Sequence, residues 1–161
     1  MKISDKNKSA AILRTLTSDR ILFLDSKTKA EAFEQLIKSL SETNEVTDCK
    51  ELQKGILYRE SLMSTGIGLE IGVPHVRLPS VKNIVMSVGV CLNPLCDYES
   101  LDNKPVRVIF MIAAGKNQHT EYIRLLASIS SKLKHSAIKE KLLELKTPEE
   151  IYELLTCNEI I

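Results

Sequence analysis

Two histidines follow predicted β-strands, at positions where an imidazole could act as a nucleophile. His75 comes directly after Pro74, which ends the short apolar run Leu69–Val73. Proline fixes its own φ and restricts the residue before it, so we expect the strand to stop there and His75 to lie directly after its end. His119 opens the helical segment after the apolar strand Val106–Ala113. Ligand sites in α/β sheets gather at the carboxyl ends of strands, so both histidines are candidates, although each alone is more often structural.

Other chemistries have less support in the sequence. His135 stands beside Lys132 and Lys134 near a predicted helix end, where the helix dipole favours a solvated cation. The chain has neither a nucleophile elbow around a serine or cysteine nor a P-loop lysine pattern. The spacing of the four cysteines matches no zinc ribbon, zinc finger or redox pair, so we expect neither a metal site nor a cofactor.

A glycine-containing turn precedes the His75 strand. Gly66 and Gly68 permit positive φ or the close approach of another group, and backbone N–H groups in such turns can line an anion site. A lone Gly-x-Gly pair is most often only a turn, so its interest comes from the histidine that follows it. Arg59 lies at the end of the preceding helical pattern, where an ion pair with Glu60 and a role in a binding site both stay open.

Length and composition favour a single globular domain. The chain has 161 residues, of which 43% are apolar and 27% charged, and its net charge is +1. This charge gives no support for a nucleic-acid or anionic-membrane partner. No apolar run approaches the roughly 20 residues that span a bilayer, and residues 1–17 lack the apolar centre of a secretory signal. We therefore expect a cytoplasmic protein without direct membrane insertion, forming one domain over residues 1–161 with its core at about 17–156.

Alternating strand and helix patterns predict the elements that position the two histidines. The first seventeen residues contain one apolar patch, typical of a loosely docked helix. Capping boxes start helices after Thr28 and Asp48, and Thr147-Pro148 starts the last one. The helix from His119 is expected to bury one side, formed by Ile123, Leu126, Ala127, Ser130 and Leu133. The remaining predicted elements are strands at Ile21–Leu24, Leu69–Val73, Ile84–Leu92 and Val106–Ala113, and a helix at Ser136–Leu145. The order predicts an α/β fold: a single domain with a mixed, mostly parallel β-sheet flanked by helices.

The central stretch of the sequence resembles a known family signature. The run Arg59-Glu60, Ser64-Thr65-Gly66-Ile67-Gly68 and Ile71-Gly72-Val73-Pro74-His75 is similar to that of the fructose/mannitol-type (type-2) enzyme IIA domains of the bacterial phosphoenolpyruvate:sugar phosphotransferase system. The similarity continues through Leu101–Met111, the segment from His119 to Ser130, Leu142-Leu143 and Ile151–Leu155. It covers roughly residues 17 to 156.

The resemblance implies a phosphocarrier. In that family the histidine of the Pro-His pair accepts a phosphoryl group from the phosphocarrier HPr and passes it to a IIB component, so His75 is the expected phosphohistidine, bonded through Nε2. His119 matches the second histidine, a donor to the phosphoryl oxygens. Arg59 matches a family arginine that neutralises phosphate charge. Backbone or hydroxyl donors from Ser64, Thr65 and Gly66 would complete a phosphate site, or would only satisfy the turn.

Three residues depart from the family pattern. Glu70 replaces a usual glycine, Gly72 a usual alanine, and Val76 a small residue. A carboxylate beside a phosphohistidine would repel phosphate, unless the period-two alternation of strand side chains turns Glu70 away.

Three functions stay open. The first is sugar transport through a IIB component, the second is regulation like that of the nitrogen-related enzyme IIA branch through protein targets, and the third is a transfer-inactive binding module. We rank transport first. Partner binding is expected around His75, where Ile67, Leu69, Val76 and Leu78 form either an apolar patch or ordinary core.

Overall fold

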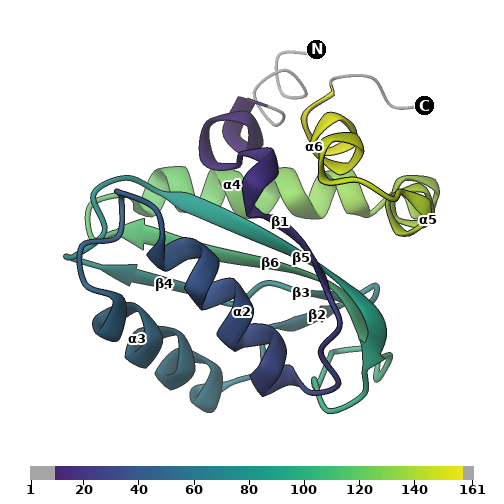
Figure 1. Cartoon of the computed structure of the whole chain (residues 1–161), viewed down its shortest axis with the longest axis horizontal. Helices are drawn as coiled ribbons and strands as arrows, with labels where there is room; N and C mark the ends of the chain where they lie inside the picture. Colours follow the sequence, from purple (N-terminus) through teal and green to yellow (C-terminus); the bar gives the residue numbers. More distant parts are fainter. Residues whose placement is uncertain (1–9, 158–161) are drawn as a thin grey trace.

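Two long strands form the centre of the sheet. The computed structural model describes residues 10–157, and in it β5 (Val85–Leu95) runs antiparallel to β6 (Val106–Gly115). The short strand β1 (Ile21–Leu24) pairs with β5 in parallel. The other edge of β6 carries β3 (Ile71–Gly72) and β4 (His75–Leu78), both parallel to it, and β2 (Gly66–Gly68) lies antiparallel to β3. The sheet is thus mixed with mostly parallel pairs, as predicted (Figure 1).

Strands β3 and β4 pair with the same edge of β6, one after the other. Ile71 pairs with Val108 and His75 with Ile112, so the register is the same on both sides of the break. The amide of Ile112 donates to the carbonyl oxygen of Pro74 at 2.9 Å, although Pro74 itself has no N–H to donate. The strand before Pro74 ends at Gly72, so the predicted stop is confirmed. His75 does not follow a free strand end, however, because it is the first residue of β4.

The predicted strand Leu69–Val73 is corrected, because its first half is a hairpin turn. Leu69 and Glu70 have φ of 58° and 66° and join β2 to β3. Two consecutive positive φ values are typical of a tight two-residue hairpin, whose backbone suits the twist of the flanking strands. Apolar composition alone did not distinguish this turn from a strand.

Helices begin where the capping residues predicted them. Thr28 caps α2 (Lys29–Ser41) by accepting from the amide of Glu31, and Asp48 caps α3 (Cys49–Leu62) in the same way from Glu51. Thr147 caps α6 (Pro148–Thr156). The remaining helices are η1 (Ser18–Arg20), α4 (His119–Leu133) and α5 (Ser136–Glu144), and residues 10–15 are also helical.

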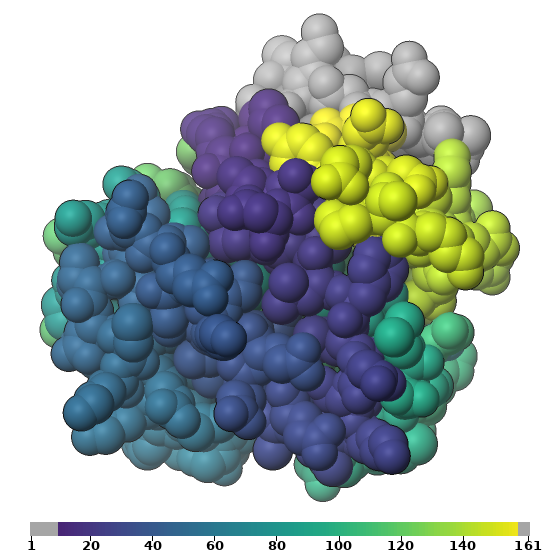
Figure 2. Space-filling model, in the orientation of Figure 1, coloured from purple at the N-terminus to yellow at the C-terminus, as the bar shows by residue number. Residues whose placement is uncertain are grey.

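Apolar side chains pack on both faces of the sheet. Helices α2 and α3 cover one face, and α4, α5, α6 and the helix at 10–15 cover the other (Figure 1). In the space-filling view, purple and blue residues from the first third of the chain cover most of the visible face (Figure 2). Ile12 and Leu16 are each only 1% exposed, so the first helix is firmly packed in the core. None of the helices in residues 10–157 is long and apolar enough to cross a membrane.

One helix faces the sheet with a different side from the predicted one. In α4 the buried positions are Tyr122, Leu125, Ser128, Ile129 and Leu133. Ile123, predicted to face inward, is 47% exposed. Two overlapping apolar stripes exist on this helix, and the aromatic ring of Tyr122 is on the one that is buried.

Candidate active site

The ring of His75 is held in one orientation by its own backbone. Its Nδ1 lies 2.9 Å from the carbonyl oxygen of Val73. A carbonyl oxygen can only accept, so Nδ1 carries the proton and Nε2 keeps its lone pair. The side chain is partly exposed at the start of β4, so the lone pair can be reached from solvent. This is the arrangement that a nucleophilic imidazole requires.

His75 and His119 line the same surface pocket of about 610 Å³. His119 is the first residue of α4, and Tyr122, one turn later, lies beside both rings. The centroid of the Tyr122 ring is 5.0 Å from that of His75 and 6.5 Å from that of His119. The full set of lining residues is Arg59, His75, Val76, Arg77, Lys116, Asn117, His119 and Tyr122.

The pocket is electropositive. Arg59 comes from the end of α3, Arg77 from β4 and Lys116 from the loop before α4. Arg59 also donates from Nη1 to the carbonyl oxygen of Met63 at 3.0 Å, which keeps its guanidinium at the end of the helix. Among the described residues no acidic side chain lines this pocket. Three cations and the N-terminus of α4 make it suitable for a negatively charged group.

Burial keeps the His75 ring neutral. Desolvation lowers its pKa from the ordinary 6.5, and the positive charges of Arg59 and Arg77 lower it further. The hydrogen bond to Val73 and the charge of Glu60 act in the opposite direction, but they are outweighed. The ring is therefore unprotonated at Nε2 near neutral pH, ready to form a bond to an electrophile.

Ser64, Thr65 and Gly66 do not line the pocket, and their polar groups have other partners. The Ser64 hydroxyl donates to the carbonyl oxygen of Glu99 at 2.6 Å. Thr65 is 5% exposed, and both its amide and its hydroxyl donate to the carboxylate of Glu60. A Cβ on Gly66 would lie 2.1 Å from the Glu99 carbonyl oxygen, so glycine is needed there for close packing. The turn is therefore a structural support behind the site.

Glu70 does not line the pocket that holds the two histidines. Its carboxylate lies 3.7 Å from Nη1 of Arg107 and 3.8 Å from Nζ of Lys139, on α5. The expected alternation of strand side chains is not the reason, because Glu70 is in the hairpin turn. Its positive φ explains why glycine suits this position, and the ion pairs show that its charge does not enter the pocket.

Sequence reasoning missed four residues of the pocket. Arg77 lies two residues after His75 on β4, so period-two alternation brings both side chains to the same face of the sheet. Tyr122 lies three residues after His119 on a helix, which is a neighbouring position. These two could have been found from spacing. Lys116 and Asn117 lie in a loop, for which no periodic pattern exists.

The apolar patch expected near His75 is divided. Ile67 and Leu69 are exposed in the β2–β3 hairpin. Val76 and Leu78 are partly buried against the core on the α3 side, where Cγ2 of Val76 would lie 2.8 Å from a Cβ on Gly55. Residues 10–157 contain no group of three or more His, Cys, Asp or Glu side chains that could hold a metal ion.

Comparison with known proteins gives a consistent set of relatives. A family model described as "Phosphoenolpyruvate-dependent sugar phosphotransferase system, EIIA 2" matches residues 14–157. The fructose-specific EIIABC component of Bacillus subtilis is 32% identical over 145 residues, which cover 89% of this chain and only 23% of that protein.

Solved structures of related proteins share the fold. The nitrogen regulatory protein IIA-Ntr from Neisseria meningitidis is 25% identical with a TM-score of 0.83, covering 90% of this chain and 99% of that one. The mannitol enzyme IIA from Escherichia coli, solved in complex with phosphorylated mannitol enzyme IIB, is 25% identical with a TM-score of 0.74. That match covers 88% of this chain and 96% of the other.

Proposed function

We propose, because this chain belongs to the EIIA 2 family of the phosphoenolpyruvate-dependent sugar phosphotransferase system, that it is a phosphocarrier that relays a phosphoryl group through His75 for sugar uptake. The donor is phosphorylated HPr and the acceptor is a IIB component of a sugar permease, which places the relay in the cytoplasm. The observation that carries the proposal is the hydrogen bond from Nδ1 of His75 to the Val73 carbonyl, which leaves Nε2 free in an electropositive pocket.

The transfer is a displacement at phosphorus. The lone pair on Nε2 of His75 forms the new N–P bond, while the N–P bond to the donor histidine breaks and its electron pair returns to the donor ring. Phosphoryl transfer of this kind needs positioning and charge stabilisation more than covalent help. The second transfer, to the IIB component, repeats the step with His75 as the leaving group.

The other pocket residues stabilise charge during the transfer. The guanidinium groups of Arg59 and Arg77 and the ammonium of Lys116 neutralise the phosphoryl oxygens, and His119 donates a hydrogen bond to one of them. No metal is needed for this scheme. The Nδ1–H of His75 remains bound to Val73 throughout, so the positive charge that develops on the phosphorylated ring is shared with a fixed acceptor.

A regulatory role is the second candidate, because a solved nitrogen regulatory protein has a TM-score of 0.83, above that of the mannitol enzyme IIA complex. In a regulatory role, phosphorylation of His75 would control binding to protein targets, and no phosphoryl group would pass to a IIB component. The third possibility, a transfer-inactive module, depended on a carboxylate near His75, and Glu70 is paired with Arg107 and Lys139 instead.

Incubation with phosphoenolpyruvate, enzyme I and HPr, followed by intact mass measurement, tests the proposal. We expect one acid-labile phosphoryl group on the wild-type chain, none on His75→Ala, and slower acceptance by His119→Ala. His135→Ala, which removes an imidazole outside the pocket, serves as the matched control. Phosphorylation of the His75→Ala protein would refute the assignment. Transfer onward to a panel of IIB proteins would favour uptake, and its absence would favour regulation.

A further inference from the structure

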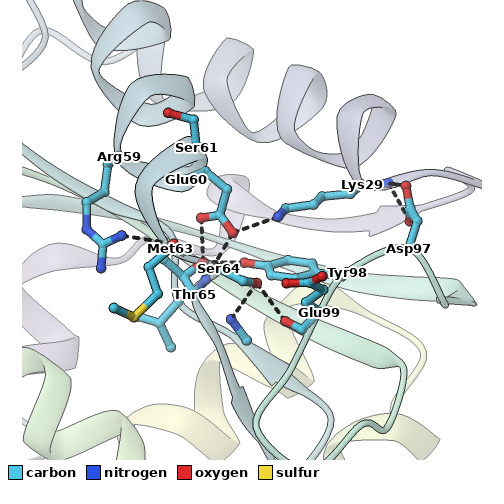
Figure 3. A network of polar contacts seen from close by, with 12 residues as sticks. Lys29, Arg59, Glu60, Ser61, Met63, Ser64, Thr65, Asp97, Tyr98 and Glu99 are labelled. Carbon is cyan, nitrogen blue, oxygen red and sulfur yellow. Dashed lines mark hydrogen bonds and ion pairs between the residues drawn. The ribbon is translucent and has the colours of Figure 1, made fainter.

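A buried carboxylate joins three segments of the chain behind the site. Glu60, near the end of α3, has a side chain that is only 7% exposed. Its Oε1 lies 2.7 Å from Nζ of Lys29 on α2, and both its oxygens accept from Thr65. Figure 3 shows the side chains of Arg59 and Glu60 on different sides of α3. Arg59 lines the pocket, whereas Glu60 belongs to a polar network with Lys29 and Thr65.

The direction of each hydrogen bond in this network follows from chemistry. The Thr65 amide donates to Oε1 of Glu60 at 3.0 Å, and the Thr65 hydroxyl donates to Oε2 at 2.7 Å. Because the single hydroxyl proton of Thr65 is committed to the carboxylate, the hydroxyl of Tyr98 must donate to Thr65 Oγ1, 2.5 Å away. Burial raises the pKa of Tyr98, so this proton stays on the ring oxygen.

The network continues through two backbone groups to the ring of His75. The carbonyl oxygen of Thr65 accepts from the amide of Val73 at 3.0 Å. The carbonyl oxygen of Val73 in turn accepts from Nδ1 of His75 at 2.9 Å. Pro74, between them, has no amide proton and a fixed φ, so little freedom remains in this link. The Val73 amide and the Nδ1–H of His75 thus each donate to one defined acceptor.

We propose that Glu60 is a positioning residue for His75, acting through Thr65 and the Val73 carbonyl to hold Nε2 toward the pocket. The effect of Glu60 on phosphoryl transfer rests on the proposed function, whereas its effect on the orientation of the His75 ring does not. A buried ion pair such as Glu60–Lys29 adds little stability compared with an apolar pair of the same shape, because desolvation offsets the attraction. A carboxylate suits this position, however, because its two oxygens accept separately from the two Thr65 donors while Oε1 also pairs with Lys29.

Two substitutions at Thr65 separate positioning from general stability. Thr65→Val keeps the shape and loses the hydroxyl, and Thr65→Ser restores the hydroxyl without the methyl group. Glu60→Gln keeps the shape of the carboxylate and loses its charge and one acceptor. Thr43→Val is the matched control, since the Thr43 hydroxyl donates a hydrogen bond of similar length, 2.8 Å, to the backbone carbonyl of Leu40 at the far end of α2.

Two measurements are made on each variant: the His75 ring-nitrogen chemical shifts by NMR without phosphate, and the rate of phosphorylation at saturating phospho-HPr. For Thr65→Val and Glu60→Gln we expect a mixture of ring tautomers and a rate lower by about tenfold, the equivalent of one net hydrogen bond. Thr65→Ser and Thr43→Val should keep the Nδ1–H tautomer and the wild-type rate.

The outcomes distinguish the two proposals. If Thr65→Val and Glu60→Gln melt at a lower temperature but keep the wild-type tautomer and rate, the network only stabilises the fold and the positioning role is refuted. If the wild-type chain is not phosphorylated while the tautomer still changes in Thr65→Val, the phosphocarrier function fails and the positioning role stands. Should Glu60→Gln not fold, the nearly isosteric Thr65→Val still decides.

Discussion

The ring of Tyr122 lies against the ring of His75, with centroids 5.0 Å apart and planes inclined at 41°. Tyr122 comes from α4 and His75 from β4, so this contact joins the helix that carries His119 to the strand that carries the nucleophile. The imidazole is therefore held by two contacts, the hydrogen bond from Nδ1 to the Val73 carbonyl and the packing against the tyrosine ring.

The first prediction tests this contact. Tyr122→Phe should retain phosphorylation within about twofold, because the packing surface is kept and a near-isosteric swap costs little. Tyr122→Ala should lower the free energy of unfolding by about 3 kcal/mol, as for other buried aromatic truncations, and should slow phosphorylation further than Tyr122→Phe. Chemical denaturation and the mass assay measure the two effects. Equal rates for the alanine and phenylalanine variants would show that the ring contact is unimportant for transfer.

The second prediction concerns the pKa of His75. An NMR titration should give a pKa below the ordinary 6.5, because burial is the largest influence on this ring. Removing a positive charge with Arg59→Gln or Arg77→Gln should raise it, and removing the negative charge with Glu60→Gln should lower it. A wild-type value at or above 6.5 would contradict the neutral nucleophile.

The lowered pKa of His75 also makes the free energy of unfolding depend on pH below 6.5. The unfolded chain binds a proton at His75 near pH 6.5, while the folded chain binds it only at lower pH. As the pH falls below 6.5 the unfolded state therefore gains protons first, and the free energy of unfolding decreases until the folded pKa is reached. A His75→Gln variant should lose this part of the slope in denaturation curves taken across the window. His135→Gln is the control.

A third prediction assigns charge stabilisation to Arg77. Arg77→Gln should slow phosphorylation by about tenfold, because one charge-assisted hydrogen bond to the phosphoryl group is lost. Arg77→Lys should recover part of the rate by restoring the charge without the planar fork. Arg124→Gln, which removes an exposed arginine outside the pocket, should have no effect. An equal loss for Arg124→Gln would indicate general steering of HPr by positive charge.

The fourth prediction concerns Glu70, which stands at φ 66°. Glu70→Gly relieves a left-handed backbone conformation but removes two long ion pairs, so the free energy of unfolding should change by less than about 1 kcal/mol. Phosphorylation should be unchanged, since the carboxylate faces Arg107 and Lys139. A clear gain in the rate of phosphorylation would show that the charge of Glu70 reaches the pocket in solution.

The sequence by itself determined where three of the helices begin, and it singled out His75 as the candidate nucleophile. Thr28, Asp48 and Thr147 cap helices through bonds that span three residues, so these starts can be read from neighbouring positions. The long apolar strand at Val106 and the run that ends in Pro74-His75 are likewise local signals.

Only the tertiary structure decided which polar groups face the site. Thr65 was a candidate either for binding phosphate or for satisfying its turn, and its hydroxyl contacts Tyr98, 33 residues away, and the carboxylate of Glu60. Lys116 follows β6, and it reaches the His75 pocket because β4 and β6 lie side by side. Spacing along a chain fixes contacts within a helical turn or a strand, whereas the Thr65 hydroxyl and the Lys116 ammonium take the partners that the packing of distant segments brings near.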